Sequence, residues 1–378
     1  MNTNDRPEPR FDWFIPIDGD GEHIGTVEAE RPPSFDYLKE VVHTAEDEGY
    51  YSQLIPTRFA NGLFEESQPL AETWTTATAL AAVTSRIRFL IAVRPGFTSP
   101  GLFAQMAAAL SNISAGRIDI NVVPGGIQGD FERLGVQSSH DQRYALAGEF
   151  MDACKRLWDS PGRPVTFAGD VVKLNGAMVS PGPVGNGPRW YLGGASPSAL
   201  DLAGRKADNL LMWIQSVETT ARLMDQARQA FDAAGRRAEF GIRTHLVVRD
   251  TEAAAWEAAD ELISKAAPIV QGQRSAQVQG TAMVGAALQA RAHSEHRVSE
   301  RLWNGISTVR VNCGTAIVGT PEQVADELVR YWSLGIDEFI LSGYPHVEEA
   351  GRVSKDVLPL VREKVSVMSQ DTGPARQN

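Results

Sequence analysis

The chain has 378 residues, 43% of them apolar and 22% charged, and its 36 basic and 47 acidic side chains give a net charge of −11 at pH 7. This apolar fraction excludes an intrinsically disordered chain, and the acidic balance argues against nucleic acid or an anionic membrane as the main partner. The two cysteines, Cys154 and Cys313, are too few for a disulfide framework, and no Cys/His spacing resembles a metal site. No apolar run fits a signal peptide or approaches the ~18 residues of a membrane span. We therefore expect a soluble, cytoplasmic protein without a metal.

Short apolar runs alternate with amphipathic stretches along the chain. The runs expected as buried strands are 13–17, 52–55, 88–93, 118–123, 189–192, 209–213, 240–248 and 338–341. The stretches expected as helices are 37–48, 71–83, 102–113, 143–158, 197–206, 217–234, 252–266 and 321–334. This alternation predicts an α/β fold with parallel strands. A closed (β/α)8 TIM barrel fits better than an open sheet, because no Gly-x-Gly-x-x-Gly turn follows the first run; periodicity alone leaves the open sheet as an alternative.

We expect a single barrel domain over residues 11–366, with disordered tails at 1–10 and 367–378. Three stretches exceed ordinary barrel loops, namely 56–73, 160–187 and 267–307. The middle stretch is rich in Gly and Pro and predicts a hairpin. The last stretch has weak apolar periodicity, with Arg274, Arg291 and Arg297 among small residues, and predicts a lid that orders when a ligand binds.

In a TIM barrel the functional residues lie at the C-terminal ends of the strands. The strand period of two places Arg243 and His245 on one face of the run 240–248, and we expect them to point into the barrel mouth. Charged side chains inside a strand are costly, which favours function over a buried structural pair. Arg310 is a second candidate cation or a surface arginine, and Tyr344 is a phenol donor or a packing residue.

The segment Gly193-Gly194-Ala195-Ser196 runs from a predicted strand into a helix. Glycines allow close backbone approach, and the free N–H groups of a helix N-terminus favour an anion, so this segment is a phosphate site or an ordinary N-capped turn. The stretch from His140 to Tyr144 adds a polar wall or a helix cap. The residues by themselves indicate a barrel enzyme with a phosphate-bearing ligand and a cationic pocket, without fixing the reaction.

Several motifs in chain order resemble one family. They include Trp13-Phe14-Ile15-Pro16, Gly241-Ile242-Arg243-Thr244-His245, Gly314-Thr315-Ala316-Ile317-Val318-Gly319 and Leu341-Ser342-Gly343-Tyr344-Pro345-His346. From about residue 11 to 365 the chain resembles the flavin-dependent alkanesulfonate monooxygenases of the bacterial luciferase-like superfamily.

The resemblance implies a two-component monooxygenase that uses reduced FMN from a separate NAD(P)H-dependent flavin reductase. With dioxygen, such an enzyme cleaves the C–S bond of an organosulfonate to give an aldehyde and sulfite. A homodimer or homotetramer is expected.

The resemblance also assigns roles to residues. It implies catalytic roles for Arg243, His245, Arg310 and Tyr344. It places Trp213, Asp18 and Thr57 at the substrate. It places Asn121, His140, Tyr144, Gly194 and Ser196 at the FMN, with His140, Tyr144, Gly194 and Ser196 around the phosphate.

Two positions depart from the family pattern. Asp18 stands where the family has a histidine, and residues 58–67 replace a short Gly-Arg-Ser-Cys turn. An added carboxylate and an altered loop favour a polyhydroxylated or sugar sulfonate over a plain alkyl chain. The alternatives are a sulfone monooxygenase or another C–S-cleaving one, a deazaflavin-dependent hydride-transfer enzyme, and a non-catalytic flavin-binding barrel.

Overall fold

A computed structural model describes residues 6–126, 128–279 and 296–371. Eight parallel strands close into a barrel in the order β1-β13-β9-β8-β7-β4-β3-β2. The barrel strands are β1 (Arg10–Phe14), β2 (Ser52–Ile55), β3 (Arg88–Val93), β4 (Ile118–Val122), β7 (Trp190–Gly193), β8 (Asn209–Trp213), β9 (Phe240–Arg243) and β13 (Glu338–Leu341). The predicted (β/α)8 TIM barrel is therefore confirmed.

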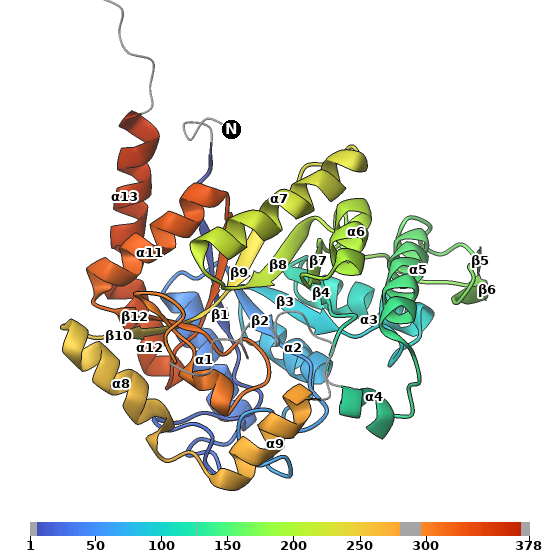
Figure 1. The fold of residues 1–378 in the computed structure, drawn as a ribbon. Coiled ribbons are helices and arrows are strands. Elements are labelled where there is room, and N and C mark those ends of the chain that lie inside the picture. Colours follow the sequence, from blue (N-terminus) through green and yellow to red (C-terminus); the bar gives the residue numbers. More distant parts are fainter. Residues whose placement is uncertain (1–5, 127, 280–295, 372–378) are drawn as a thin grey trace, which may run out of the picture.

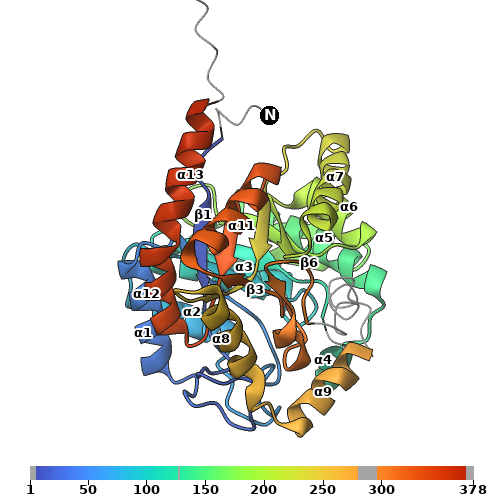
Figure 2. The same ribbon diagram turned by 60° about the vertical axis from the view of Figure 1, so that its left-hand side comes forward.

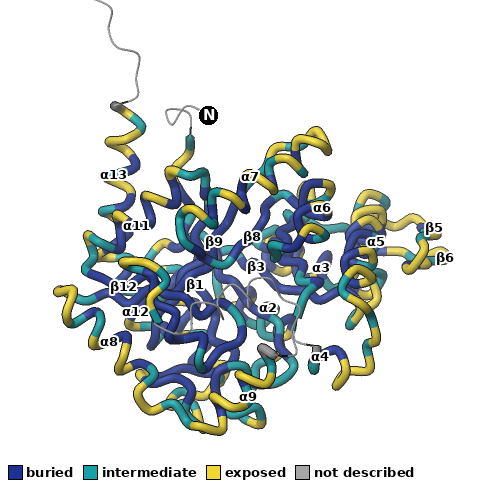
Figure 3. Tube along the Cα trace, viewed as in Figure 1, coloured by how far each residue is buried: buried dark blue, intermediate teal, exposed yellow. Residues whose placement is uncertain are grey.

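Helices surround the barrel (Figures 1 and 2). They are α1 (Phe35–Asp47), α2 (Thr73–Ala82), α3 (Pro100–Ile113), α4 (Gln128–Arg133), α5 (His140–Trp158), α6 (Pro197–Lys206), α7 (Val217–Ala233), α8 (Glu252–Ser264), α9 (Pro268–Gln279), α11 (Pro321–Leu334), α12 (His346–Asp356) and α13 (Leu358–Asp371). Figure 3 shows the buried strands at the centre and the exposed outer faces of the helices. The main core lies between the outward face of the strands and the inward face of these helices.

The predicted run 240–248 is two strands rather than one. After β9 the chain leaves the barrel at Thr244, and β10 (His245–Val248) pairs with β12 (Ala316–Gly319) in a three-stranded sheet completed by β11 (Leu302–Trp303). The prediction that Arg243 and His245 occupy successive inward positions of one strand is therefore wrong. The break arises because the amide of Thr244 bonds to the Ile340 carbonyl of β13, whereas the amide of His245 bonds to Thr315 outside the barrel.

The insertions are partly as predicted. Residues 160–187 contain the antiparallel hairpin β5 (Val165–Ala168) and β6 (Lys173–Ala177), which confirms that expectation. Residues 267–307 begin with α9, but 280–295 lie outside the described residues, and the predicted lid stays a prediction. Helix α13 runs to Asp371, so the expected disordered tail from 367 is wrong for its first five residues.

Among the described residues, no helix is both long enough and apolar enough to cross a membrane.

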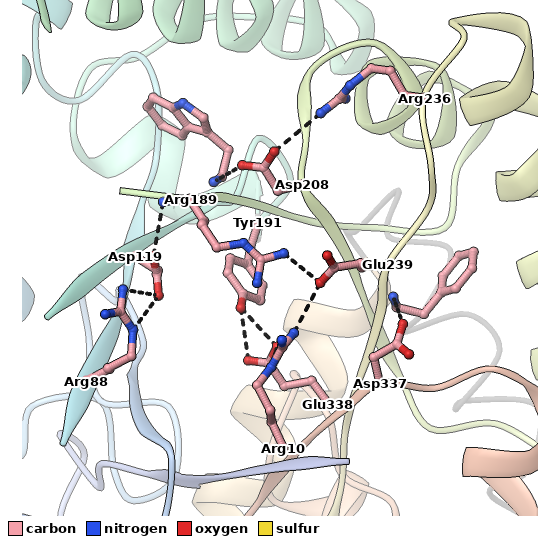
Figure 4. A network of polar contacts seen from close by, with 12 residues as sticks. Arg10, Arg88, Asp119, Arg189, Tyr191, Asp208, Arg236, Glu239, Asp337 and Glu338 are labelled. Carbon is pink, nitrogen blue, oxygen red and sulfur yellow. Dashed lines mark hydrogen bonds and ion pairs between the residues drawn. The ribbon is translucent and has the colours of Figure 1, made fainter. Parts of the chain in front are cut away.

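A network of ion pairs crosses the floor of the barrel, at the N-terminal ends of the strands (Figure 4). Arg10 lies 2.6 Å from a carboxylate oxygen of Glu338, which also accepts a hydrogen bond from the Tyr191 hydroxyl at 2.9 Å. Arg88 pairs with Asp119 at 2.8 Å. Charged side chains inside the barrel are tolerated here because they are paired, as burial requires.

The floor holds one more carboxyl group than arginines. The arginines are Arg10, Arg88 and Arg189, and the acidic residues are Asp12, Asp119, Glu239 and Glu338. Asp12 is fully buried beside Glu338 and pairs with no arginine among the described residues. Burial, followed by the charge of Glu338, raises the pKa of the Asp12 carboxyl well above its ordinary value. We therefore expect Asp12, rather than Glu338 beside Arg10, to hold a proton in the folded state.

Replacing Asp12 by asparagine should change how stability depends on pH. Because the folded state holds this proton more tightly than the unfolded chain, the free energy of unfolding should fall as pH rises above about 4. The variant cannot ionise, so its free energy of unfolding minus that of the parent should increase from pH 5 to pH 8, by up to about 1.4 kcal/mol per pH unit. Urea unfolding at several pH values measures this. A difference in unfolding free energy between variant and parent that is the same at every pH would show that Asp12 does not carry the proton.

Two neighbouring surface helices, α2 and α3, contain no charged residue, although 22% of the chain is charged. On α3, Leu102 and Ile113 are each 54% exposed and lie on one stripe with Gln105 and Ala109. Small and apolar residues without charge suit close packing against an identical helix pair.

We expect a second copy of the chain to cover this stripe, which fits the predicted homo-oligomer. Replacing Leu102 and Ile113 together by glutamate should then shift the protein toward the monomer in size-exclusion chromatography with light scattering. The exposed pair Val171 and Met178, changed in the same way, is the control. An unchanged mass in the α3 variant would place the interface elsewhere.

Candidate active site

A cavity of about 200 Å³ opens at the C-terminal ends of the barrel strands. Its base is an apolar layer inside the barrel that includes Phe14, Leu54 and Leu211. This layer separates the cavity from the polar floor described above. The side chains that line the cavity come from strand ends and from the loops that follow them, as expected of a TIM-barrel site.

One end of the cavity is formed by the N-terminus of α6. Ser196 is the N-cap, and its hydroxyl accepts a hydrogen bond from the Ala199 amide. Gly194, with φ of +153°, brings the backbone close to α6, and a Cβ there would lie 2.7 Å from the Cβ of Ala199 and 3.2 Å from the Tyr144 hydroxyl. Only glycine therefore fits. Pro197 carries no N–H and the Ala199 amide bonds to Ser196, so α6 offers an anion the Ser198 amide and the positive end of its helix dipole.

The first turn of α5 forms a second wall at this end. His140 and Tyr144 line the cavity, with ring centroids 4.9 Å apart. Arg143 also lines it, donating only to the carbonyls of Pro124 and Ser138. Because Arg143 has no carboxylate partner among the described residues, its charge is available to an anion. Together with α6, this wall fits a phosphate group.

The middle of the cavity suits a flat ring system. Its apolar lining includes Leu54 and Leu211 of the base, together with Trp213 at the end of β8. Asn121 also lines the cavity, and its buried Oδ1 has no hydrogen-bond partner in the described part of the chain. A buried acceptor without a donor is costly, so it calls for an N–H group on a ligand. These residues fit the isoalloxazine ring of a flavin, whose phosphate would lie against α6.

The other end of the cavity carries two buried guanidinium groups. Arg243 at the end of β9 and Arg310 are 4% and 3% exposed, and neither has a carboxylate within ion-pair distance in the residues described. Their guanidinium carbons lie 4.4 Å and 5.2 Å from the centre of the Phe14 ring. Burial lowers the pKa of Arg243 to about 10, which still leaves it charged at pH 7. Two buried cations without counter-ions predict an anionic ligand.

Arg243 is held by a chain of hydrogen bonds that ends at His245. Its NH2 group donates to the Ser342 hydroxyl at 2.8 Å, and that hydroxyl donates to Nδ1 of His245 at 2.7 Å. Nε2 of His245 lies 2.9 Å from the carbonyl oxygen of Cys313 and must therefore carry the proton. His245 is fully engaged and does not line the cavity, so it positions Arg243 rather than touching a ligand.

The His245 ring should stay neutral throughout the physiological range. Burial, followed by the charges of Arg243 and Arg310, lowers its pKa well below the ordinary value. We expect its imidazole ¹⁵N signals to stay constant from pH 8 to pH 5.5, at shifts typical of the Nε2–H tautomer. His43, which is exposed, provides the comparison. A His245 titration near its ordinary pKa of about 6.5 would contradict the hydrogen-bond chain.

The remaining predicted residues divide into two groups. Thr57 lines the cavity, as do Trp213 and the five residues assigned to FMN. Tyr344 lies behind Arg310, whose NH1 donates to its hydroxyl at 3.0 Å, and burial raises the pKa of this phenol so that it stays protonated. Asp18 lies outside the cavity, where its carboxylate binds Arg58 at 2.9 Å. Neither Tyr344 nor Asp18 is placed for direct ligand contact.

The cavity also contains polar residues that the sequence did not single out. Arg94 follows β3 and pairs with Asp130 at 2.9 Å, while Gln215 and Asn312 add uncharged groups. Arg94 directly follows a barrel strand, and this position could have identified it as a candidate site residue. Asn312 lies in the turn before β12, and no apolar periodicity in the sequence predicts that this turn reaches the cavity.

Comparison with known proteins relates this chain to one family. Residues 10–338 match the sequence model of the luciferase-like monooxygenases. The chain resembles the crystal structure of a riboflavin lyase with modified FMN and riboflavin, at a TM-score of 0.76 and 19% identity over 95% of this chain and 92% of that one. It resembles EDTA monooxygenase from Chelativorans sp. BNC1 at a TM-score of 0.75 and 18% identity, over 95% of this chain and 94% of that one. It also resembles an F420-dependent secondary alcohol dehydrogenase with an F420–acetone adduct, at a TM-score of 0.68 and 19% identity, over 94% of this chain and 100% of that one. At these identities the likeness shows a shared fold.

Proposed function

Because the chain belongs to the luciferase-like monooxygenase family, we propose that it is the oxygenase of a two-component system that uses reduced FMN and dioxygen to cleave the C–S bond of an organosulfonate. The observation that carries the proposal is the pair Arg243 and Arg310, two buried guanidinium groups without carboxylate partners among the described residues. They lie in the same cavity as a helix terminus suited to a phosphate.

A sulfonate matches this pair of arginines. It carries a permanent negative charge on three equivalent oxygens, and a guanidinium offers paired N–H donors that do not deprotonate. In a chain of net charge −11 the overall field repels an anion, so the attraction has to be local. The free-energy cost of removing the sulfonate from water is then offset by its contacts with two fixed cations.

In the proposed reaction, reduced FMN, dioxygen and the sulfonate give oxidised FMN, water, an aldehyde and sulfite. Reduced FMN supplies two electrons when bound, and dioxygen supplies one oxygen atom to the organic product and the other to water. The C–S bond breaks, so that an aldehyde and sulfite leave. The residues of this chain orient the sulfonate through Arg243 and Arg310. The neutral Tyr344 phenol holds a proton beside Arg310, and the apolar base of the cavity excludes water.

Reduced FMN would come from an NAD(P)H-dependent flavin reductase, a separate protein of the same compartment, for which we propose the cytoplasm. The cavity is open at the barrel mouth, so free reduced flavin can enter it. No contact surface for the reductase is needed in this scheme.

A panel of organosulfonates tests the proposal. The protein is supplied with photochemically reduced FMN, a sulfonate and air, and sulfite is measured. We expect sulfite only when both reduced FMN and oxygen are present. Parallel arms with dimethyl sulfone, reduced FMN and air, and with oxidised F420 plus a secondary alcohol, examine the alternatives. Turnover in either of those arms, with no sulfite from any sulfonate, would replace the proposal by the corresponding alternative.

A further inference from the structure

We propose that Asn312 is a specificity-determining hydrogen-bond donor for an oxygen on the carbon skeleton of the substrate, and that Arg58 and Asp18 hold it in position. This inference rests on the proposed function, since it concerns the organosulfonate that the same cavity would take. It assigns that substrate to the hydroxylated sulfonates.

Arg58 is fixed behind the cavity wall. Its Nε lies 2.9 Å from Oδ2 of Asp18, and the side chains are 5% and 1% exposed. The other carboxylate oxygen of Asp18 accepts the amide of Gly62 at 2.7 Å. A Cβ on Gly62 would lie 2.6 Å from NH1 of Arg58, so the backbone presses directly against the guanidinium. The residue at position 18 and the segment 58–67, the two departures noted in the sequence, thus form one unit.

This unit determines the orientation of the Asn312 amide. With the amide oxygen directed at Arg58, that oxygen lies 2.7 Å from NH1 and 3.0 Å from NH2, and so accepts two charge-assisted hydrogen bonds. The reverse orientation would point an NH2 group at a guanidinium. Because the oxygen is taken, Asn312 can only donate to a ligand in the cavity that it lines.

The unit does not add to the anion site. The charge of Arg58 is balanced by Asp18, whereas Arg243 and Arg310 have no such partner in the described residues. A sulfonate is therefore expected at Arg243 and Arg310, and Asn312 is left for a neutral acceptor. A hydroxyl or ether oxygen on the substrate meets that requirement, and a plain alkyl chain does not.

An alkyl sulfonate would desolvate the Asn312 N–H groups without replacing their water. A site that leaves a donor unpaired discriminates roughly 10- to 100-fold against the poorer ligand. We therefore expect a preference of that size for 2,3-dihydroxypropane-1-sulfonate over propane-1-sulfonate.

The first experiment measures kcat/KM from sulfite release for these two sulfonates. In the parent the dihydroxy compound should be favoured 10- to 100-fold, and in Asn312→Ala the ratio should fall to within about threefold of unity. Exposed Asn186, changed to alanine, is the matched control and should keep the parent ratio. Arg58→Met should lower the ratio like Asn312→Ala, and Arg58→Lys, which can still donate to the amide oxygen, should restore part of it. If a substitution only loosens the packing, kcat/KM should fall equally for both sulfonates and their ratio should stay at the parent value. An unchanged ratio in Asn312→Ala would overturn the inference.

The second experiment does not depend on turnover. Isothermal titration of the protein loaded with oxidised FMN measures the affinity for each sulfonate in the parent, in Asn312→Ala and in Asn312→Leu, with circular dichroism to confirm folding. Tighter binding of the dihydroxy compound that is lost in the variants supports the inference, even if no sulfonate is turned over and the proposed function fails. Equal affinities in the parent, or a preference that survives in both variants, would contradict it.

Discussion

Arg243→Ala should reduce kcat/KM for sulfonate turnover about 30- to 1000-fold while reduced FMN still binds. The side chain is buried at the end of β9, lines the cavity and has no carboxylate partner among the described residues. Its removal therefore deletes a charge-assisted contact with the ligand, at a cost on the order of 2–4 kcal/mol of transition-state binding. Arg243→Lys should recover only part of the activity, because an ammonium group cannot reproduce the paired N–H donors.

The matched control is Arg222→Ala on the exposed face of α7. It removes the same charge from the chain and should leave both turnover and flavin binding at parental values. If Arg243→Ala stays within about threefold of the parent, the anion lies elsewhere in the cavity.

Gly194→Ala should weaken the binding of reduced FMN by on the order of 100-fold without unfolding the protein. The residue has φ of +153°, and the added methyl would meet Ala199 at 2.7 Å and the Tyr144 hydroxyl at 3.2 Å. The loop would have to move away from α6, which would displace the helix terminus that we propose to hold the phosphate. Anaerobic titration followed by flavin fluorescence or absorbance measures the affinity.

Gly185→Ala is the control for backbone strain. Gly185 also has a positive φ, of +62°, but nothing lies within 4 Å of an added Cβ. Both variants lose the conformational freedom of glycine, yet only Gly194→Ala should affect flavin. Equal loss of flavin binding in the two would mean that strain, not the phosphate loop, is responsible.

The barrel could be predicted because its strands are short, apolar and evenly interrupted. Leu210 and Ile340, for example, lie in apolar runs that are bounded by polar residues and turns. Each of these runs forms a buried strand. Helices could be predicted where several apolar residues recur at helical spacing, as in α1, where Leu38, Val41, Val42 and Ala45 are buried. Local periodicity carries this information directly.

The break at Thr244 could not be predicted from the same pattern. Residues on both sides of it are buried and β-forming, and only the competing partners Ile340 and Thr315 divide β9 from β10. The helices α12 and α13 were also missed. Five of the eleven residues of α12 are charged, and its only buried apolar side chains are Ala350 and Val353, so its apolar pattern is sparse.

The candidate site shows the same division. Arg243 and Gly194 could be found because strand ends carry function in this fold and a glycine before a helix marks an anion site. His245 was expected to touch a ligand, but a hydroxyl 97 positions away on Ser342 takes its Nδ1. The pairing of Asp18 with Arg58 depends likewise on two loops meeting, and no spacing in the chain records it.

The most direct test of the account is a single turnover. The protein is loaded anaerobically with reduced FMN and the preferred sulfonate and then mixed with oxygenated buffer, and sulfite and flavin oxidation are followed together. The account predicts sulfite in stoichiometric amount with the oxidised flavin, and none when oxygen is withheld. Full oxidation of the flavin with no sulfite from any sulfonate tested, or sulfite released without oxygen, would contradict it.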